Sequence, residues 1–394
     1  LAAERRRGAV PGLTRTTVHH RPLGVVGIIS PWNYPLTLAA SDAVAALMAG
    51  NAVVLKPDSA TPFTALAVHS LLRRAGADPD LLQVVTGPGA ALGESLIDAV
   101  DALMFTGSSA TGSAVASRAG ARLIPVSAEL GGKNPLIVRA DAPVARTVRG
   151  AVGACFSNAG QLCVSIERVY VHEAVWDRFV PAFVRATRAL RVGAAMGWGA
   201  DMGPLISPEH LAKVAAHVSD AVAKGATVLT GGRALPELSP TAYAPTLLTG
   251  VTEDMDLHAA ETFGPVACLY RVSGDEEAVR LANASPYGLN ASVWTADRHA
   301  GAELAGRIRA GTVNVNEGYA AAWGSTAAPM GGMGASGLGR RHGVEGIVKY
   351  TQSQTVAVQH LAPLHAPPGA DGERWASGMA AWLRLARHLP RLDR

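Results

Sequence analysis

The chain has 394 residues, 48% hydrophobic and 17% charged, a composition typical of a two-domain globular protein that excludes a largely disordered chain. Its formal net charge is +4, and no basic stripe with aromatic residues indicates a nucleic-acid partner, because the excess arginines lie at positions 5–7, 384, 387, 391 and 394. No run is apolar enough to span a bilayer, no signal peptide is recognised, and the three cysteines fit neither a disulfide framework nor a metal site. We therefore expect a cytoplasmic protein without a membrane partner or a bound metal.

From residue 23 onward, short apolar runs alternate with stretches of helical periodicity, as in a parallel sheet covered by helices on both faces. In the first block, strands are predicted at residues 23–29, 52–55, 81–85 and 102–105, and helices at 37–49, 61–76 and 110–119, with Thr61 as a helix cap. In the second block, strands are predicted at 135–138, 169–171, 226–229, 266–272, 289–294 and 311–315, and helices at 144–156, 174–190, 207–223, 275–284 and 300–309.

Three side chains have the chemistry of an acyl-transfer site. Cys163 follows the small polar turn NAGQ, where backbone N–H groups can favour a thiolate; Cys155 and Cys268 are expected to be ordinary buried residues. Glu129 ends an apolar run before two glycines and could activate water, although a lone carboxylate is more often a solvated surface group. Asn33 lies between the prolines of SPWNYP, where its amide could donate to an oxyanion or serve only as a turn residue.

Weaker signals point to a nucleotide. Lys56 closes the AVVLKP strand, at the end of a parallel strand where ligands usually bind. Gly107 and Ser108 open a helix, whose first N–H groups can hold a phosphate. Glu261 and Phe263 place a carboxylate and an aromatic ring ahead of another strand in ETFGPV.

Taken together, the segments resemble the aldehyde dehydrogenase superfamily, and within it bacterial NADP-type succinate-semialdehyde dehydrogenases. The resemblance covers roughly residues 15–360 and rests on PWNYP, LKP, FTGS, ELGGKNP, NAGQLC, ETFGPV, SPYGLNASVW and GGMGASGLGR in this order. It implies an α/β fold: a Rossmann-like cofactor domain, a second α/β catalytic domain and a small oligomerisation strand arm. The implied divisions are a linker and part of the arm at 1–22, an N-terminally incomplete NAD(P)-binding domain at 23–130, the catalytic domain at 131–334, a return to the cofactor domain with an oligomerisation strand at 335–360, and a tail at 361–394.

The resemblance also implies a mechanism. Cys163 attacks the aldehyde, Asn33 and the Cys163 backbone N–H hold the oxyanion, and Glu129 activates the water that hydrolyses the thioester. The cofactor is NADP or NAD, and the positions matched to its site are Trp32, Lys56, Ser59, Gly107, Ser108, Leu130, Glu261 and Phe263. NAD-preferring relatives often carry a glutamate where this chain has Ser59, so we expect NADP to be accepted.

The substrate is less determined by the sequence. Well-understood succinate-semialdehyde dehydrogenases hold the substrate carboxylate with two arginines, and this chain has Ser41 and Ser157 at those positions. Arg168 is close enough in sequence to compensate. The remaining matched positions describe a mostly apolar tunnel, which leaves an aliphatic or aromatic aldehyde open: Tyr34, Leu162, Val164, Trp323 and Met330.

Two departures and two alternatives complete the expectations. Relatives often read GGxKxSGxGRE near the end, where this chain has Gly334 for the lysine and Arg341 for the acid. A CoA-acylating enzyme is one alternative, against which Glu129 argues. A non-catalytic fragment is the other, because relatives begin with a helical segment ahead of the position of Leu1. Strands at residues 14–22 and 351–359 are expected to join subunits into a dimer or tetramer.

Overall fold

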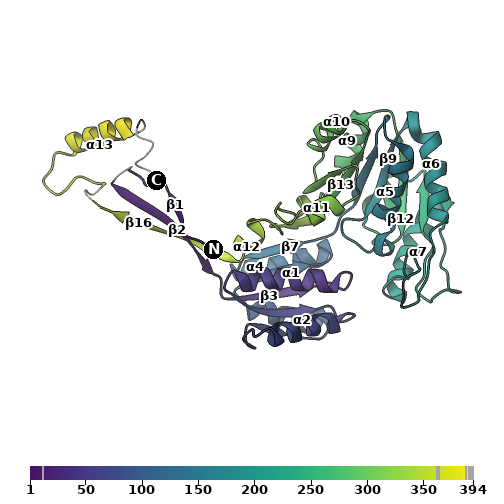
Figure 1. The fold of residues 1–394 in the computed structure, drawn as a ribbon, viewed down its shortest axis with the longest axis horizontal. Helices are drawn as coiled ribbons and strands as arrows, with labels where there is room; N and C mark the ends of the chain where they lie inside the picture. The colour runs from purple at the N-terminus through teal and green to yellow at the C-terminus, as the bar shows by residue number, and fades with distance from the viewer. Residues whose placement is uncertain (11–12, 361–363, 387, 389–394) are drawn as a thin grey trace.

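The computed structural model describes residues 1–10, 13–360, 364–386 and 388, and it contains three sheets (Figure 1). A six-stranded and a seven-stranded sheet with their helices form the body, and a three-stranded sheet projects from it as an arm (Figure 1). Part of the predicted tail, including the arginines at 387, 391 and 394, lies outside the described residues.

The six-stranded sheet has the order β15-β7-β6-β3-β4-β5 and is parallel except for β15. Its strands are β3 (Val25–Ser30), β4 (Ala52–Pro57), β5 (Leu82–Val84), β6 (Ala102–Thr106), β7 (Val126–Glu129) and β15 (Gly337–Leu338). One apolar cluster packs α1 (Pro35–Met48) and α2 (Pro62–Arg74) on one face, and another packs α3 (Gly89–Asp98) and α4 (Ser109–Ala121) on the other. The four inner strands β3, β4, β6 and β7 are mostly buried on both faces, which explains why they read as short continuous apolar runs.

The seven-stranded sheet has the order β10-β11-β12-β9-β8-β13-β14, with β10 antiparallel to its neighbour. Its strands are β8 (Asn134–Val138), β9 (Ile166–His172), β10 (Thr227–Thr230), β11 (Thr246–Thr249), β12 (Val266–Val272), β13 (Asn290–Trp294) and β14 (Thr312–Val315). Its helices are α5 (Val144–Phe156), α6 (Glu173–Arg188), α7 (Pro208–Ala223), α8 (Asp256–Ala259), α9 (Asp275–Asn283), α10 (Arg298–Ala305) and α11 (Ala320–Gly324). Short α12 (Glu345–Val348) leads from the body back to the arm.

The arm consists of β1 (Glu4–Arg6), β2 (Thr14–Pro22) and β16 (Thr351–Gln359), with α13 (Gly372–Ala386) beside it (Figure 1). β2 and β16 pair antiparallel along their whole length, from Thr14 with Gln359 to Pro22 with Thr351. The two predicted arm segments therefore form strands with the expected bounds. β16 is an edge strand of this sheet and almost every one of its residues is exposed, the arrangement to which a further chain can add a strand.

The predicted alternation of strands and helices is confirmed, but several elements were not predicted, among them the short β1, β7, β15, α8, α11 and α12. Helix α3 was not predicted, because GAALGESLID mixes glycine with a short apolar stripe. β11 was also missed, since four residues between loops give little periodicity. Thr61 does precede α2, yet its hydroxyl makes no capping hydrogen bond, so the proposed side-chain cap is wrong.

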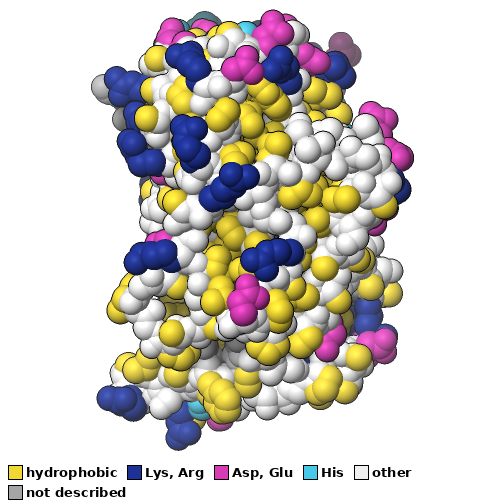
Figure 2. All heavy atoms as spheres, turned by 90° about the vertical axis from the view of Figure 1, so that its right-hand side faces the viewer, with side chains coloured by type: hydrophobic (Ala, Val, Ile, Leu, Met, Phe, Trp, Pro, Cys, Tyr) yellow, Lys and Arg dark blue, Asp and Glu magenta, His cyan; other side chains and the backbone are white. Residues whose placement is uncertain are grey.

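The surface carries mixed charge. On the face drawn in Figure 2, basic and acidic side chains are interspersed among neutral ones. Within the described part of the chain, no helix combines the length and the apolar character needed to cross a bilayer. The same part contains no group of three or more histidine, cysteine and acidic side chains that could bind a metal ion.

Candidate active site

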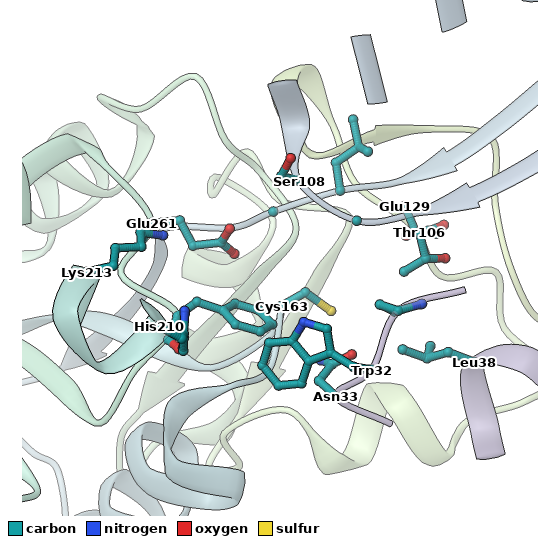
Figure 3. A pocket seen from close by; sticks show the side chains of 15 residues that line it. Trp32, Asn33, Leu38, Thr106, Ser108, Glu129, Cys163, His210, Lys213 and Glu261 are labelled. Atoms are coloured by element: carbon teal, nitrogen blue, oxygen red, sulfur yellow. The ribbon is translucent and has the colours of Figure 1, made fainter. Parts of the chain in front are cut away.

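A cavity of about 250 Å³ lies where segments from both large sheets meet (Figure 3). Carboxyl ends of parallel strands meet at one sheet edge, so the residues after β3, β6 and β7 contribute together. The second sheet contributes the loop before β9, helix α7 and the loop before β12. The lining residues are Pro31, Trp32, Asn33, Leu38, Thr106, Gly107, Ser108, Glu129, Leu130, Gly131, Cys163, His210, Lys213, Glu261 and Phe263.

Cys163 lies at the end of a loop with an unusual backbone. Three consecutive residues adopt left-handed φ angles: 51° at Asn158, 55° at Ala159 and 71° at Gly160. A Cβ at Gly160 would lie 2.0 Å from the carbonyl oxygen of Gly264, so only glycine fits there. This tight turn directs the chain so that the sulfur of Cys163 faces the cavity (Figure 3). Cys155 and Cys268 are buried elsewhere, as expected.

Asn33 contacts the same loop from the other sheet. Its Nδ2 donates to the carbonyl oxygen of Gln161 at 3.0 Å, and its own carbonyl oxygen accepts from Asn158 Nδ2 at 3.2 Å. On the far side, Asn134 Nδ2 donates to the carbonyl oxygen of Cys163 at 2.7 Å. The thiol and the Asn33 amide are therefore held at one wall of the cavity, with one Nδ2 hydrogen of Asn33 still free to bind a ligand.

The resting state of Cys163 differs from the expectation. Burial, followed by the nearby Glu261 carboxylate, raises the pKa of this thiol to about 12, and only Arg341 and the residue's own N–H oppose the rise. The residue's own N–H lowers the pKa, in the expected direction, but burial and the two nearby carboxylates outweigh it, so the net effect favours the thiol. Because the thiolate is the nucleophile, this cysteine needs a base or a bound ligand to activate it.

Glu129 is a buried carboxyl at the end of β7. Burial raises its pKa to about 7, and the cations of Arg341 and Lys349 limit the rise. Its Oε1 has no hydrogen-bond partner among the described residues, which leaves it free to bind a water molecule or a proton. A carboxyl with a pKa near neutrality is suited to general-base chemistry.

A buried ion pair stands behind Glu129. Arg341 contacts Asp42 with nitrogen–oxygen distances of 2.6 and 3.1 Å and donates to Thr106 Oγ1 at 2.5 Å. Lys349 Nζ lies 3.5 Å from Asp42 Oδ1. Arg341, which stands where relatives often carry an acid, thus links the wall of the active-site cavity to α1. The other departure, Gly334, has φ +58°, a conformation that suits glycine.

The opposite end of the cavity is aromatic and acidic. The ring of Trp32 packs edge-on against those of Phe263 and His210, at centroid distances of 5.7 and 5.8 Å. Glu261 Oε1 accepts from the N–H of Gly132 at 2.8 Å. Burial and the neighbouring Glu167 carboxylate raise the pKa of Glu261 to about 7.

Helix α7 supplies two cavity residues that sequence reasoning missed. His210 Nε2 lies 2.7 Å from the carbonyl oxygen of Phe263, and Lys213 Nζ donates to the carbonyl oxygen of Glu261 at 2.9 Å. Both side chains line the cavity and contact its acidic end (Figure 3). They lie one helical turn apart. This spacing predicts that the two side chains share one face of the helix, but not which segment that face contacts.

Of the other predicted cofactor positions, Gly107 and Ser108 line the cavity. Gly107 and Ser108 lie at the start of α4, where the Ser108 side chain caps the helix. Lys56 is buried and donates to the carbonyl oxygen of Pro57 at 3.0 Å. Ser59 is exposed and donates to the carbonyl oxygen of Gly87 at 2.9 Å. Lys56 and Ser59 do not line the 250 Å³ cavity.

These residues fit a nicotinamide dinucleotide. A helix start with free N–H groups suits a pyrophosphate, and a carboxylate near the cavity floor can accept from ribose hydroxyls. Two glycines allow close packing here: a Cβ at Gly131 would lie 2.4 Å from Glu261 Oε2, and one at Gly112 would lie 2.3 Å from Leu130 Cδ2. The ring of Phe263, which lines the cavity, can pack on a nicotinamide ring.

The predicted substrate positions divide into two groups. Five of them cluster with Cys163 and form an apolar surface on its other side: Tyr34, Leu162, Val164, Trp323 and Met330. Ser41 and Ser157 are absent from this cluster, and their hydroxyls donate to the carbonyl oxygens of Thr37 in α1 and Gly153 in α5, each at 2.6 Å. Leu289 and Tyr319 belong to the cluster but were not predicted.

Arg168 does not compensate for the missing arginines. Its guanidinium is buried and donates to the carbonyl oxygens of Lys133, Leu281 and Ala282 at 2.8 to 3.1 Å. It also lies on the ring of Tyr170. These contacts hold the guanidinium in the core of the seven-stranded sheet, so it does not bind a substrate carboxylate.

The chain belongs to the aldehyde dehydrogenase family, whose model matches residues 2–356. A Mycolicibacterium smegmatis protein named "Putative succinate-semialdehyde dehydrogenase", with NADP(+) given in the name, is 53% identical over 390 residues, or 99% of this chain and 75% of that protein. The solved structure of an NADP-dependent enzyme from E. coli is 36% identical, with a TM-score of 0.87 over 91% of this chain and 74% of its own. An NAD-dependent aldehyde dehydrogenase from Sinorhizobium meliloti is 35% identical, with a TM-score of 0.88 over 93% and 73%.

The reaction of this chain is therefore the oxidation of an aldehyde with NAD or NADP. The fold expected from the resemblance, two α/β units with parallel sheets, is confirmed. Neither the non-catalytic reading nor an apolar substrate is favoured by these relatives.

The pKa of Glu129 predicts how thioester hydrolysis depends on pH. Only the ionised carboxylate can take a proton from water, so hydrolysis should rise about tenfold per pH unit below pH 7 and level off above it. Arg341→Met removes the main opposing cation and should move the midpoint to higher pH. The measurement is the rate of loss of an acetyl group from Cys163 between pH 5 and 9. A midpoint near 4.5, unchanged in the variant, would contradict this assignment.

Proposed function

We propose that Cys163, Asn33 and Glu129 carry out this oxidation, with succinic semialdehyde as the substrate. The observation that supports it is the convergence of a thiol, an amide and a buried carboxyl on one cavity whose other end suits a nicotinamide. None of the three is remarkable alone, but together they supply a nucleophile, an oxyanion donor and a base.

The steps follow from the charges of the site. The Cys163 thiol releases its proton to solvent as the sulfur bonds to the aldehyde carbon, and Glu129, with a pKa near 7, serves only the later hydrolysis. The carbonyl oxygen becomes an oxyanion, to which the free Asn33 N–H and the Cys163 N–H donate; each such donor typically lowers the barrier by ~3 kcal/mol. A bound nicotinamide supplies the acceptor for the hydride. The resulting thioester is hydrolysed by water that loses its proton to Glu129, and the C–S bond breaks to release the acid.

Residues further from the chemistry would hold the cofactor. Glu261 would accept from the nicotinamide ribose, Phe263 would contact the nicotinamide, Ser108 would contact the pyrophosphate and Lys56 the adenosine ribose. Ser59 carries no charge that would repel a 2′-phosphate, so NADP would be accepted as well as NAD.

Succinic semialdehyde is proposed because relatives that share about half of their residues with this chain are named for it. A second candidate, an apolar aliphatic or aromatic aldehyde, is favoured by the apolar cluster beside Cys163 and by the serines at positions 41 and 157. The chemistry at Cys163 is the same for both candidates. They differ only in the group at the far end of the aldehyde that the pocket beside Cys163 would bind.

Assembly and location are part of the same proposal. The exposed edge of β16 supports a homodimer or homotetramer formed through the arm. Three free cysteines, two of them buried, fit the reducing cytoplasm. We also propose the domain boundaries at 130/131 and 334/335. The first is supported by the passage from β7 to β8, which lie in different sheets, and the second by the return of β15 to pair with β7.

The catalytic roles predict distinct failures. Cys163→Ala should abolish NADPH formation, because no nucleophile remains. Glu129→Gln should allow a burst of NADPH close to one per active site and then slow turnover, because the thioester accumulates. Mass spectrometry of the trapped acyl-enzyme checks the second variant. Normal steady-state turnover by either variant would refute its assignment.

The cofactor proposal predicts the effect of a charge at position 59. Ser59→Glu should raise the KM for NADP about tenfold or more through repulsion of the 2′-phosphate, while that for NAD stays level or falls. Ser59→Ala is the control and should change neither. Steady-state kinetics with NADP and with NAD measure both KM values. A wild type that uses NAD but not NADP would contradict the cofactor proposal.

The substrate proposal predicts a modest preference for a carboxylate. Compared with its isostere 4-methylpentanal, succinic semialdehyde should have a kcat/KM about tenfold higher, because neutral hydrogen-bond donors contribute about 1 kcal/mol each. Ser157→Arg should increase that ratio by adding a guanidinium fork. Faster oxidation of 4-methylpentanal by the wild type would instead favour the apolar aldehyde.

A further inference from the structure

A buried ion pair lies beneath the cofactor end of the cavity. Lys133 and Glu167 are 1% and 3% exposed, and Lys133 Nζ lies 2.5 Å from Glu167 Oε2. Neither side chain lines the cavity. Removing two charges from water costs about as much free energy as their attraction returns. A buried ion pair therefore adds little to the stability of the fold, and its presence needs another reason. Its other contacts therefore indicate what it does.

Those contacts are to the backbone of the loop that carries Glu261 and Phe263. Glu167 accepts from the N–H of Thr262 with both oxygens at 3.1 Å and from the N–H of Phe263 at 3.0 Å. Phe263 has a φ of +58°, the left-handed region that an aromatic residue seldom adopts. Such a conformation persists only where surrounding contacts impose it, and the Glu167 carboxylate provides two of them.

The pair also connects the three functional segments of the site. Lys133 follows Glu129 by four residues, and Glu167 follows Cys163 by four. Between them, Gly132 N–H donates to the Glu261 carboxylate at 2.8 Å. A displacement of Glu167 would thus move the loop of Glu261 and Phe263 relative to the base and the nucleophile.

We propose that Glu167, held by Lys133, is a positioning residue that fixes the Glu261–Phe263 loop for the nicotinamide half of the cofactor. This role rests on the proposed function, because it assumes that Glu261 and Phe263 contact the cofactor. The outer contacts from His210 and Lys213 hold carbonyl oxygens of the same loop, whereas Glu167 holds its N–H groups. Loss of Glu167 would leave those N–H groups buried without an acceptor, and the loop would relax away from its left-handed turn.

The test compares binding with a reaction that needs no cofactor. Transfer of an acetyl group from p-nitrophenyl acetate to Cys163 forms a thioester and releases p-nitrophenolate, and water then releases acetate; no hydride acceptor takes part. Glu167→Ala should raise the Kd for NADP+, measured by titration calorimetry, by about tenfold or more, since small displacements near a reacting centre have large effects. Its p-nitrophenyl acetate hydrolysis should stay within about twofold of wild type.

Graded variants separate position from charge. Glu167→Gln keeps one oxygen that can accept from the Phe263 N–H, so its Kd should lie between those of the wild type and Glu167→Ala. Lys133→Met leaves Glu167 unpaired and should weaken NADP+ binding as well, and the double variant Lys133→Met/Glu167→Gln removes both charges together. Glu173→Gln, an exposed change at the start of α6, is the matched control and should alter nothing.

The outcomes divide clearly. Unchanged NADP+ binding by Glu167→Ala would overturn the proposal, and so would parallel losses of binding and ester hydrolysis, which indicate a purely structural pair. If Glu167→Ala does not fold, Glu167→Gln and the double variant decide on the same two measurements. This inference alone is refuted if the wild type oxidises aldehydes through Cys163 and the variants still bind NADP+ normally. The proposed function is refuted if the wild type is inactive with every aldehyde.

Discussion

Two hydrogen bonds tie the six-stranded sheet to the seven-stranded sheet at the reacting centre. Asn33 donates to the carbonyl oxygen of Gln161, and Asn158 donates to the carbonyl oxygen of Asn33. Because the proposed oxyanion donor follows β3 and the nucleophile precedes β9, the active site exists only while the two sheets keep this contact. The three left-handed residues before Gln161 make that close approach feasible, and the glycine among them is required by the carbonyl of Gly264.

Burial then shapes the chemistry. The same exclusion of water raises the pKa values of Cys163, Glu129 and Glu261, so each prefers its neutral form more than in solution. For the thiol this is a disadvantage, and for Glu129 it is an advantage, because a carboxyl with a pKa near 7 is a stronger base than an exposed one. Arg341 moderates both effects, which gives a structural reason for a buried cation at that position.

The sequence predicted those parts that depend on local periodicity. The bounds of α5 and β12 were predicted to the residue, since Val144–Phe156 shows a clean helical stripe and Val266–Val272 a continuous apolar run. The motifs also predicted that Cys163, Glu129 and Asn33 share one site, and all three line the same cavity. Contacts between distant segments could not be read in this way. His210 and Lys213 lie on an ordinary amphipathic helix, and Arg168 looked available because sequence distance does not show where a side chain points.

The buried cations around the site limit what the substrate pocket can recognise. Arg341 and Lys349 pair with Asp42, Lys133 pairs with Glu167, and Arg168 binds carbonyl oxygens. A guanidinium that already serves a buried carboxylate cannot turn to a second one without leaving the first unpaired, a cost that usually exceeds the gain. A substrate carboxylate beside Cys163 would therefore depend on hydroxyl and amide donors, which discriminate less strongly than an arginine fork. The chemistry at the thiol is the same for every aldehyde, so the selectivity of this chain depends on the weaker, neutral part of its pocket.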